Sequence, residues 1–494
     1  MVKNKPVYAF EEADSKNRML LGGKGAGLSE MTRLKLPVPP GFTITTEVCN
    51  NYYDNGKKLP KDVMPLVMKN IVKMEKKTGK KWNSTKNPLL VSVRSGAAIS
   101  MPGMMDTILN LGLNEKTVEG FAQQTKNPRF SWDSYRRFIQ LFGKVVFGVN
   151  DEKFDHVLDS AKKKQGVKDD SKLNVESLKK IVAEYKKICE KHTKRKFPDT
   201  PNEQLGLAIE AVFKSWMGER AIVYREKNNI TKDIANGTAV NVVTMVFGNM
   251  GDDSATGVVF TRNGHNGKKE IEGEYLINAQ GEDVVAGVRT GKSIELLKKD
   301  MPKSHKELSN ACAKLEKHFR EPQDIEFTIE QGKFYLLQTR TAKMSAAALV
   351  KTSVDMVKEK LINKDKALTR IPAQQLEALL HRTMDESKIK NFKKLAKGIA
   401  ASPGAASGIV VFDVKKAIEL GDSGKKVILV RKETKPEDVP AFFSSEGILT
   451  SLGGKSSHAA IVSRGMGKPC IVGCPELKID YDNNVGTANG MTIK

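Results

Sequence analysis

The apolar and polar positions along this chain follow two different periods, which predict a mixture of strands and helices. Short runs of branched apolar residues that end at glycine or at a polar turn are typical of strands. Longer polar stretches with apolar residues three or four positions apart are typical of helices. The mixture predicts an α/β (α+β) fold class. Strands are predicted at 7–10, 89–94, 238–248, 258–262, 323–329, 334–340, 408–412, 426–430, 447–450 and 470–472.

Three changes in this pattern divide the chain. Residues 114–202 read as helical and lysine-rich without strands, which predicts a helical insertion. After Arg340 come short alanine- and lysine-rich helical stretches with polar breaks, which favour a connector, and a compact α/β unit begins near Lys397. The length of 494 residues suggests about three domains. We expect them at 1–341 (with the insertion at about 114–202), 342–396 as a helical linker, and 397–494.

The stretch from Gly453 to Gly467 carries the clearest candidate for chemistry. A predicted strand enters two glycines, and Ser457 is a good N-cap, so His458 is expected in the first turn of a helix. The positive end of the helix dipole disfavours imidazolium and welcomes an anion there, so the pKa of His458 should lie at or below its ordinary value. A phosphoryl group carried on His458 is one reading; a histidine that only hydrogen-bonds a tight turn is the other. A Walker A loop is excluded, because Leu449 stands where that motif needs glycine.

A second candidate site lies on a predicted hairpin. Strict alternation over 323–329 puts Asp324, Glu326 and Thr328 on one face of a strand and large apolar residues on the other. On the return strand, Gln338 and Arg340 share a face. Two carboxylates two residues apart can hold Mg²⁺ against ATP phosphates, although a solvent-facing polar strand would look similar.

Two basic residues are further candidates. Lys24 follows two glycines in a turn that leads into a helix, where main chain and ammonium can both approach a phosphate. An ordinary strand-to-helix turn would look the same. Arg94 is expected where its strand ends, a position from which it could clamp phosphate oxygens or form a rim salt bridge.

Composition narrows the function classes. The 82 basic and 58 acidic residues give a net charge of +24, but the lysines are spread over helical surfaces and aromatic residues make up only 6%. This favours a solvated basic surface over a nucleic-acid interface. The five cysteines are scattered, which favours reduced thiols over disulfides or a zinc site. With no apolar run of membrane-spanning length and no signal-peptide pattern, we expect no membrane partner and a location in the cytoplasm or an organelle matrix.

Taken together, these stretches resemble the pyruvate, phosphate dikinase family, and the resemblance covers essentially the whole chain. The segments that carry it are 22–26, 93–97, 273–290, 324–327, 337–340 and 453–467. The resemblance implies an ATP-grasp nucleotide-binding domain and a swivelling phosphohistidine domain joined by a mobile linker. The loop 97–106 resembles the dikinase version and not that of phosphoenolpyruvate synthase.

The resemblance also implies roles for individual residues. His458 would be the phosphocarrier, and Arg94 would act beside it in catalysis. Asp324 and Glu326 would hold Mg²⁺. ATP would be contacted by Lys24, Arg94, Met245, Val246, Phe247, Glu282, Gln338 and Arg340, with Met245 to Phe247 flanking the adenine.

The activity that this implies is the first half of a dikinase reaction. ATP and inorganic phosphate would become AMP and pyrophosphate while His458 is phosphorylated, and pyruvate would then become phosphoenolpyruvate. The family's pyruvate-binding barrel, through which a homodimer could form, has no counterpart here, so we expect no phosphoenolpyruvate from this chain alone. The alternatives are a catalytically idle binding module or a half-enzyme with another acceptor. Lys455 and Ser456 depart from the usual Met-Thr before Ser-His.

Overall fold

The computed structural model describes residues 4–101, 103–285, 291–378 and 392–494. The chain forms two compact units, Met1–Val246 and Phe247–Lys494. The division falls inside the predicted nucleotide-binding domain 1–341, and the predicted boundaries at 341 and 397 remain predictions. Over the described residues, we find no helix with the length and apolar character needed to span a bilayer.

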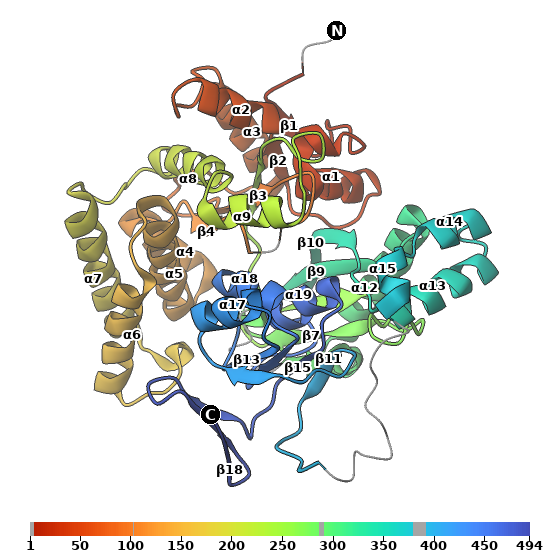
Figure 1. The fold of residues 1–494 in the computed structure, drawn as a ribbon. Coiled ribbons are helices and arrows are strands. Elements are labelled where there is room, and N and C mark those ends of the chain that lie inside the picture. Colours follow the sequence, from red (N-terminus) through yellow and green to blue (C-terminus); the bar gives the residue numbers. More distant parts are fainter. Residues whose placement is uncertain (1–3, 102, 286–290, 379–391) are drawn as a thin grey trace. The chain divides into compact units, whose positions relative to one another are not determined.

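The first unit is built on one antiparallel five-stranded sheet, drawn in red to yellow-green in Figure 1. Its strands run in the order β1 (Val7–Ala9), β2 (Gly41–Ile44), β5 (Ala239–Thr244), β3 (Val91–Gly96) and β4 (Thr107–Leu111). The central strand β5 is buried along its whole length, as expected for a strand with neighbours on both sides. The helices that pack on this sheet include α1 (Arg18–Arg33), α2 (Thr46–Asp54), α3 (Val63–Thr78) and α8 (Pro201–Ser215).

The predicted helical insertion is observed as helices without strands. Each helix begins after a polar residue whose side chain accepts hydrogen bonds from the first turn, so local sequence explains where each one starts. These caps are Asn114, Asn127, Asn150, Asn174 and Thr200. The helices are α4 (Glu115–Thr125), α5 (Pro128–Phe147), α6 (Asp151–Gln165), α7 (Val175–Thr193) and then α8; α9 (Glu219–Lys227) follows.

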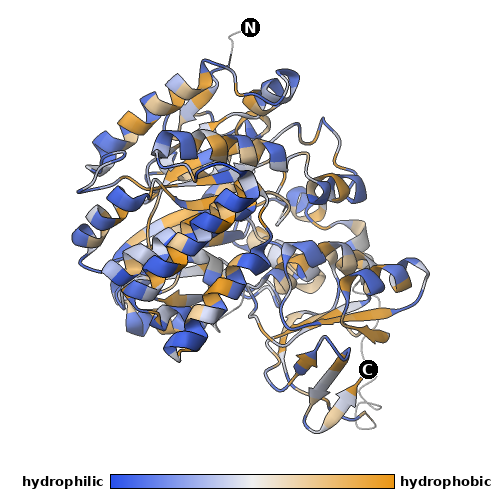
Figure 2. Ribbon diagram, turned by 90° about the vertical axis from the view of Figure 1, so that its left-hand side faces the viewer, coloured by the Kyte–Doolittle hydropathy of each residue, from blue (hydrophilic) through white to orange (hydrophobic). Residues whose placement is uncertain are grey.

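The second unit contains a second antiparallel sheet. Its order is β10 (Lys333–Thr341), β9 (Gln323–Glu330), β6 (Ala255–Phe260), β7 (Glu272–Ile277) and β8 (Lys292–Ser293). The helix α12 (Pro302–Phe319) packs on β9 and β10, while the short helices α10 (Gly281–Val285) and α11 (Leu297–Asp300) lie between β7 and α12 in sequence. In Figure 2 the strands are mostly orange and the helices carry blue faces, in accordance with cores that lie between the layers.

The helices described in the predicted linker are α13 (Ala346–Lys358), α14 (Lys364–Thr369) and α15 (Ala373–Ala378). Ion pairs tie the residues that follow α13 and α14 to elements beside this second sheet. Arg262, which follows β6 and is fully buried, donates to Glu316 on α12 and to Glu359 at the end of α13, with Nη2–O distances of 2.8 and 2.7 Å. Arg370 donates to Glu321 at 2.9 Å. Residues 379–391 of the predicted linker lie outside the described residues.

The C-terminal part of the second unit is a mostly parallel sheet. Its order is β11 (Ile399–Ser402), β15 (Cys470–Val472), β14 (Gly447–Thr450), β13 (Val427–Arg431) and β12 (Ile409–Val411), and only β11 runs antiparallel to its neighbour. The crossovers α17 (Val414–Asp422), α18 (Val439–Ser444) and α19 (His458–Met466) lie on one side of it (Figure 1). A small sheet of β16 (Lys478–Asp480), β17 (Val485–Ala488) and β18 (Met491–Ile493) follows.

The buried ion pair between Arg262 and Glu316 gives a stability prediction. Glu316→Gln leaves a desolvated guanidinium without its main charge partner, which should cost the second unit about 3 kcal/mol. Hydrogen exchange of peptides from β6 and β9 should then accelerate. The unfolding transition followed by tryptophan fluorescence should not change, because Trp82, Trp132 and Trp216 all lie in the first unit. Lys269→Met, which removes an exposed partner of Glu359, is the matched control and should alter neither signal. Equal exchange in the parent and in Glu316→Gln would contradict this prediction.

Candidate functional site

His458 lies at the edge of the C-terminal sheet where the loops that follow β13 and β14 emerge. The strand β14 ends at Thr450, a loop with Gly453 and Gly454 follows, and α19 begins at His458. Ser457 is the N-cap, with its side chain accepting from the main-chain N–H of Ala460, as predicted. Because β13 and β14 are parallel, the loop after β13 emerges at the same edge of the sheet and brings Thr434 to the imidazole.

The imidazole of His458 is held dry and neutral. Its side chain is 8% exposed and meets the ring of Phe442 edge to face at 6.1 Å. Burial lowers the pKa of His458 to about 4, against a small opposing effect of Glu437. The predicted direction of this pKa is confirmed, and desolvation is its main cause.

The two ring nitrogens of His458 differ in their surroundings. Nδ1 lies 3.3 Å from Oγ1 of Thr434, whereas Nε2 is buried without a hydrogen-bond partner. When Nδ1 carries the proton and donates it to Thr434, Nε2 keeps its lone pair. A buried, unpartnered ring nitrogen is costly unless another group uses it, which fits a nucleophile that waits for an electrophile.

Two carboxylates on β7 bind the loop before His458. Glu272 forms an ion pair with Nζ of Lys455, and Glu274 accepts from Oγ of Ser456 at 3.2 Å. Burial raises the pKa of Glu274, while hydrogen bonds from Ser456 and from the Lys455 main chain oppose that rise. A Cβ at Gly454 would overlap the Glu274 carboxylate, so only glycine permits this approach.

The predicted carboxylate pair and its cross-strand partners come together through an irregularity in the hairpin. Arg340 lies opposite Asp324 and donates from Nε to Oδ2 at 2.6 Å, and Gln338 lies opposite Glu326. The register shifts by one residue between Leu336 and Gln338; without that bulge Gln338 would face the core residue Ile325. The bulge therefore turns Gln338 and Arg340 to the face of the carboxylates.

This face is not a solvated polar strand. Asp324 is 3% exposed, burial raises its pKa against the pull of Arg340, and its Oδ1 is buried without a hydrogen-bond partner. An orphaned carboxylate oxygen two residues from a second carboxylate fits a divalent cation that prefers hard oxygen ligands. Among the described residues no group of three or more His, Cys, Asp or Glu could hold a metal, so such an ion would need oxygens from water or phosphate as well. Mg²⁺ commonly binds in that way.

Two of the predicted basic residues lie in the first unit on two elements that contact each other, α1 and β3. Lys24 is on α1 just after Gly22, which has φ of 66° and approaches Gly96 on β3 so closely that a Cβ would overlap its carbonyl. The prediction that β3 ends at Arg94 is wrong: β3 continues to Gly96, because those residues pair with β5, and Arg94 lies within it opposite Asn241.

The other predicted contacts are only partly described. Strand β5 ends at Thr244, earlier than the predicted end at 248, and Met245, Val246 and Phe247 follow it. Met245 donates its N–H to the Leu90 carbonyl, in register with the pairing of β5 and β3, whereas Phe247 donates to the Glu330 carboxylate at 2.7 Å. The side chain of Glu282, residues 286–290 and Pro102 lie outside the described residues.

The structure thus brings the predicted residues into separate groups within the two units. Lys24 and Arg94 belong to the first unit; Asp324, Glu326, Gln338 and Arg340 form one group in the second, and His458 another. Sequence analysis missed Thr434, Phe442 and Glu274, which are far from His458 in sequence and carry no local signal of their own.

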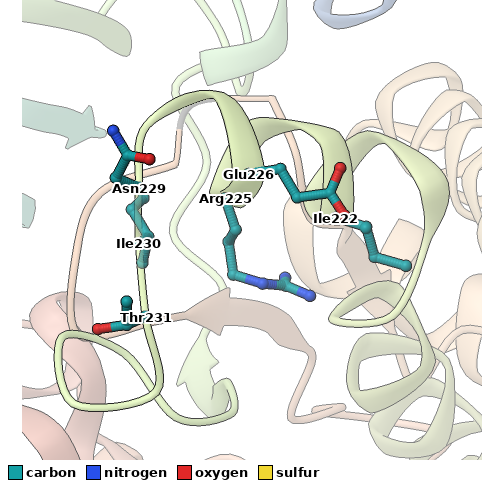
Figure 3. Close-up of a pocket in the computed structure, with 6 residues that line it drawn as sticks. All are labelled: Ile222, Arg225, Glu226, Asn229, Ile230 and Thr231. Carbon is teal, nitrogen blue, oxygen red and sulfur yellow. The ribbon is translucent and has the colours of Figure 1, made fainter.

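An open hollow of about 320 Å³ in the first unit is a different feature (Figure 3). None of the predicted site residues lines it. Arg225 lies beside it, stacks on Trp216 at 3.9 Å and donates to the Trp216 carbonyl, which accounts for its orientation. The lining residues are Ile222, Arg225, Glu226, Asn229, Ile230 and Thr231.

The five cysteines are free and buried.

Comparison with known proteins covers both units. A family model described as "Pyruvate phosphate dikinase, AMP/ATP-binding domain" matches residues 18–63, 55–307 and 302–361, and one described as "PEP-utilising enzyme, mobile domain" matches 424–492. The chain is 53% identical over 489 residues to a pyruvate, phosphate dikinase of Entamoeba histolytica, covering 99% of this chain and 55% of the relative. It is 50% identical over 488 residues to that of Clostridium symbiosum, covering 99% and 56%.

A plant relative gives the same picture. The chain is 46% identical over 496 residues to "Pyruvate, phosphate dikinase 1, chloroplastic" of Arabidopsis thaliana, covering 100% of this chain and 51% of the relative. The chain therefore spans about half the length of the curated relatives that it matches.

The lowered pKa of His458 predicts a pH dependence of stability. Below the unfolded pKa of about 6.5 the unfolded chain binds a proton that the folded imidazole refuses until about pH 4. Stability should therefore fall as pH decreases through this window. Between about pH 7 and about pH 4.5 the parent should lose roughly 2 to 3 kcal/mol more than His458→Gln, as measured by chemical denaturation of both proteins. Parallel curves for the two proteins would mean that His458 titrates normally.

The contact between Thr434 and Nδ1 predicts a reactivity effect. Thr434→Val removes the group that orients the ring, so phosphorylation of His458 by phosphoramidate, a small donor that needs no nucleotide site, should slow about tenfold. Thr434→Ser keeps the hydroxyl and should react like the parent. Equal rates for all three proteins would remove Thr434 from the site.

Proposed function

Because this chain belongs to the pyruvate, phosphate dikinase family, we propose that it moves the β-phosphoryl group of ATP to Nε2 of His458. The bond from Nε2 to the β-phosphorus forms, and the bond from that phosphorus to the oxygen of AMP breaks. The γ-phosphoryl passes to inorganic phosphate, so that AMP and pyrophosphate leave. Transfer of this phosphoryl group from His458 to the enol oxygen of pyruvate would then give phosphoenolpyruvate.

The observation that carries this proposal is the buried, unpartnered Nε2 of a neutral His458. Its partner Thr434 occupies only Nδ1, so the lone pair of Nε2 is available. The N-terminus of α19 favours negative charge on the ring, which lowers the cost of forming a phosphoryl adduct there. The loop that precedes His458 has the glycines that let other groups approach closely.

The remaining residues are proposed to bind the nucleotide. ATP would be contacted by Lys24, Arg94, Glu282, Gln338 and Arg340. Met245, Val246 and Phe247, which leave strand β5, would flank the adenine. Asp324 and Glu326 would hold Mg²⁺, which when bound would neutralise charge on the transferring phosphates.

The decisive experiment is labelling of the intact chain with β-³²P-ATP, Mg²⁺ and inorganic phosphate. The parent should gain an acid-labile, base-stable phosphoryl group on His458, seen by intact mass and peptide mapping. His458→Asn should gain none, whereas His192→Asn, which changes an exposed histidine on α7, should label fully. Label on a residue other than His458 would refute the assignment.

A second experiment tests the carboxylate pair. Asp324→Asn and Glu326→Gln should each slow ATP-dependent labelling by roughly a thousandfold, because phosphoryl transfer loses several kcal/mol of electrostatic stabilisation. Glu270→Gln, a change at an exposed carboxylate before β7, is the matched control. Labelling of the two variants by phosphoramidate should stay normal. Parental rates with ATP would place the metal elsewhere.

A further inference from the structure

Arg464 is a buried cation in the last turn of α19 whose contacts reach three different elements. Arg464 is 4% exposed. Nε donates to the carbonyl of Ala401 on β11 at 3.0 Å, and Nη2 donates to the carbonyl of Lys455 at 2.6 Å. The guanidinium also lies 5.1 Å from the centre of the Phe260 ring on β6.

The contact with Lys455 closes a loop around His458. Lys455 precedes His458 by three residues and Arg464 follows it by six, so one hydrogen bond joins the segment before the histidine to the far end of its helix. A planar guanidinium holds two carbonyls in a fixed fork while its face stacks on a ring, a geometry that the compact ammonium of lysine does not reproduce. The shape of the segment 453–457 therefore depends on Arg464.

The segment 453–457 is also the one that the carboxylates of β7 contact. Glu272 pairs with Nζ of Lys455, and Glu274 approaches Gly454 and Ser456. The ring of Phe260, which neighbours Glu272 across the strands, meets the other side of the Arg464 guanidinium. A displacement of the loop would thus disturb its contacts with β7 and the stack on β6 together.

We propose that Arg464 is a positioning residue that holds the segment 453–457 in the shape which Glu272 and Glu274 recognise, so that seating of the phosphohistidine loop on β6 and β7 and presentation of His458 occur as one event. This rests on the proposed function only in its catalytic consequence. The contacts that define it are those of Arg464, Lys455 and Phe260.

The seating can be measured without ATP. A carbodiimide joins the amine of Lys455 to the carboxylate of Glu272 only while the loop is seated, and the yield is quantified by peptide mass spectrometry. The pair Lys269–Glu359, which lies 2.8 Å apart in the same unit, is the internal reference. The ratio of the two cross-links should fall about tenfold in Arg464→Lys, in which the guanidinium fork is lost.

A matched control is available in the same sheet. The guanidinium of Arg431 lies 4.8 Å from the ring centre of Tyr481, donates to the Phe412 carbonyl at 2.8 Å and pairs with Asp438 at 3.7 Å, and none of these partners belongs to the segment 453–457. Arg431→Lys should leave the cross-link ratio within about twofold of the parent. Phe260→Leu alters the stack from the side of β6 and should lower the ratio even if Arg464→Lys folds poorly. An unchanged ratio in Phe260→Leu and in folded Arg464→Lys would overturn the proposal.

The catalytic consequence separates positioning from a purely structural role. At saturating ATP, Arg464→Lys should label His458 roughly 10- to 100-fold more slowly with unchanged half-saturating ATP, because a displacement of about 1 Å has that effect on a reacting group. Labelling by phosphoramidate should stay within about threefold of the parent, since it needs no seating. Equal losses with both donors would mean that Arg464 only maintains the imidazole and would overturn the proposal. If ATP fails to label the parent, the proposed function fails, and the cross-link ratio alone decides the role of Arg464.

Discussion

The nucleophilic role proposed for His458 requires an imidazole that is dry, neutral and unpartnered at one nitrogen, and the residues around His458 in the C-terminal part of the second unit meet that requirement. Phe442 packs edge to face on the buried ring of His458, and Thr434 contacts Nδ1 alone. Each feature has a cost: a buried nitrogen without a partner and a suppressed proton both destabilise the fold. The fold bears this cost at the end of β14, where a sharp glycine turn and a helix N-terminus coincide.

The features of the candidate site that could be predicted from the sequence are those that depend on residues close together in the chain. Ser457 caps a helix because its hydroxyl suits that position, and this placed His458 correctly without any tertiary information. Likewise the alternation of Asp324 and Glu326 with Ile325 and Phe327 placed the carboxylates on one face of β9. Both inferences depend on neighbours within four residues.

What depends on distant residues was not predictable in the same way. The bulge between Leu336 and Gln338 decides which residue faces Glu326, and nothing in those residues announces it. Thr434 reaches His458 only because β13 and β14 are parallel neighbours, and Glu274 reaches Ser456 across 182 positions of sequence. The position of Arg94 inside β3 was missed for the same reason, since pairing with β5 extends that strand.

The ion pairs of Arg262 and Arg370 set a limit on distance. They tie the residue after α13 and the residue after α14 to elements beside the second sheet, and Arg370 is the later of the two anchors in sequence. Strand β11 of the C-terminal sheet begins at Ile399, a difference of 29 positions from Arg370. Whatever its conformation, a chain of that length spans at most about 100 Å. The covalent chain itself therefore sets an outer radius, measured from Arg370, beyond which the start of β11 cannot lie.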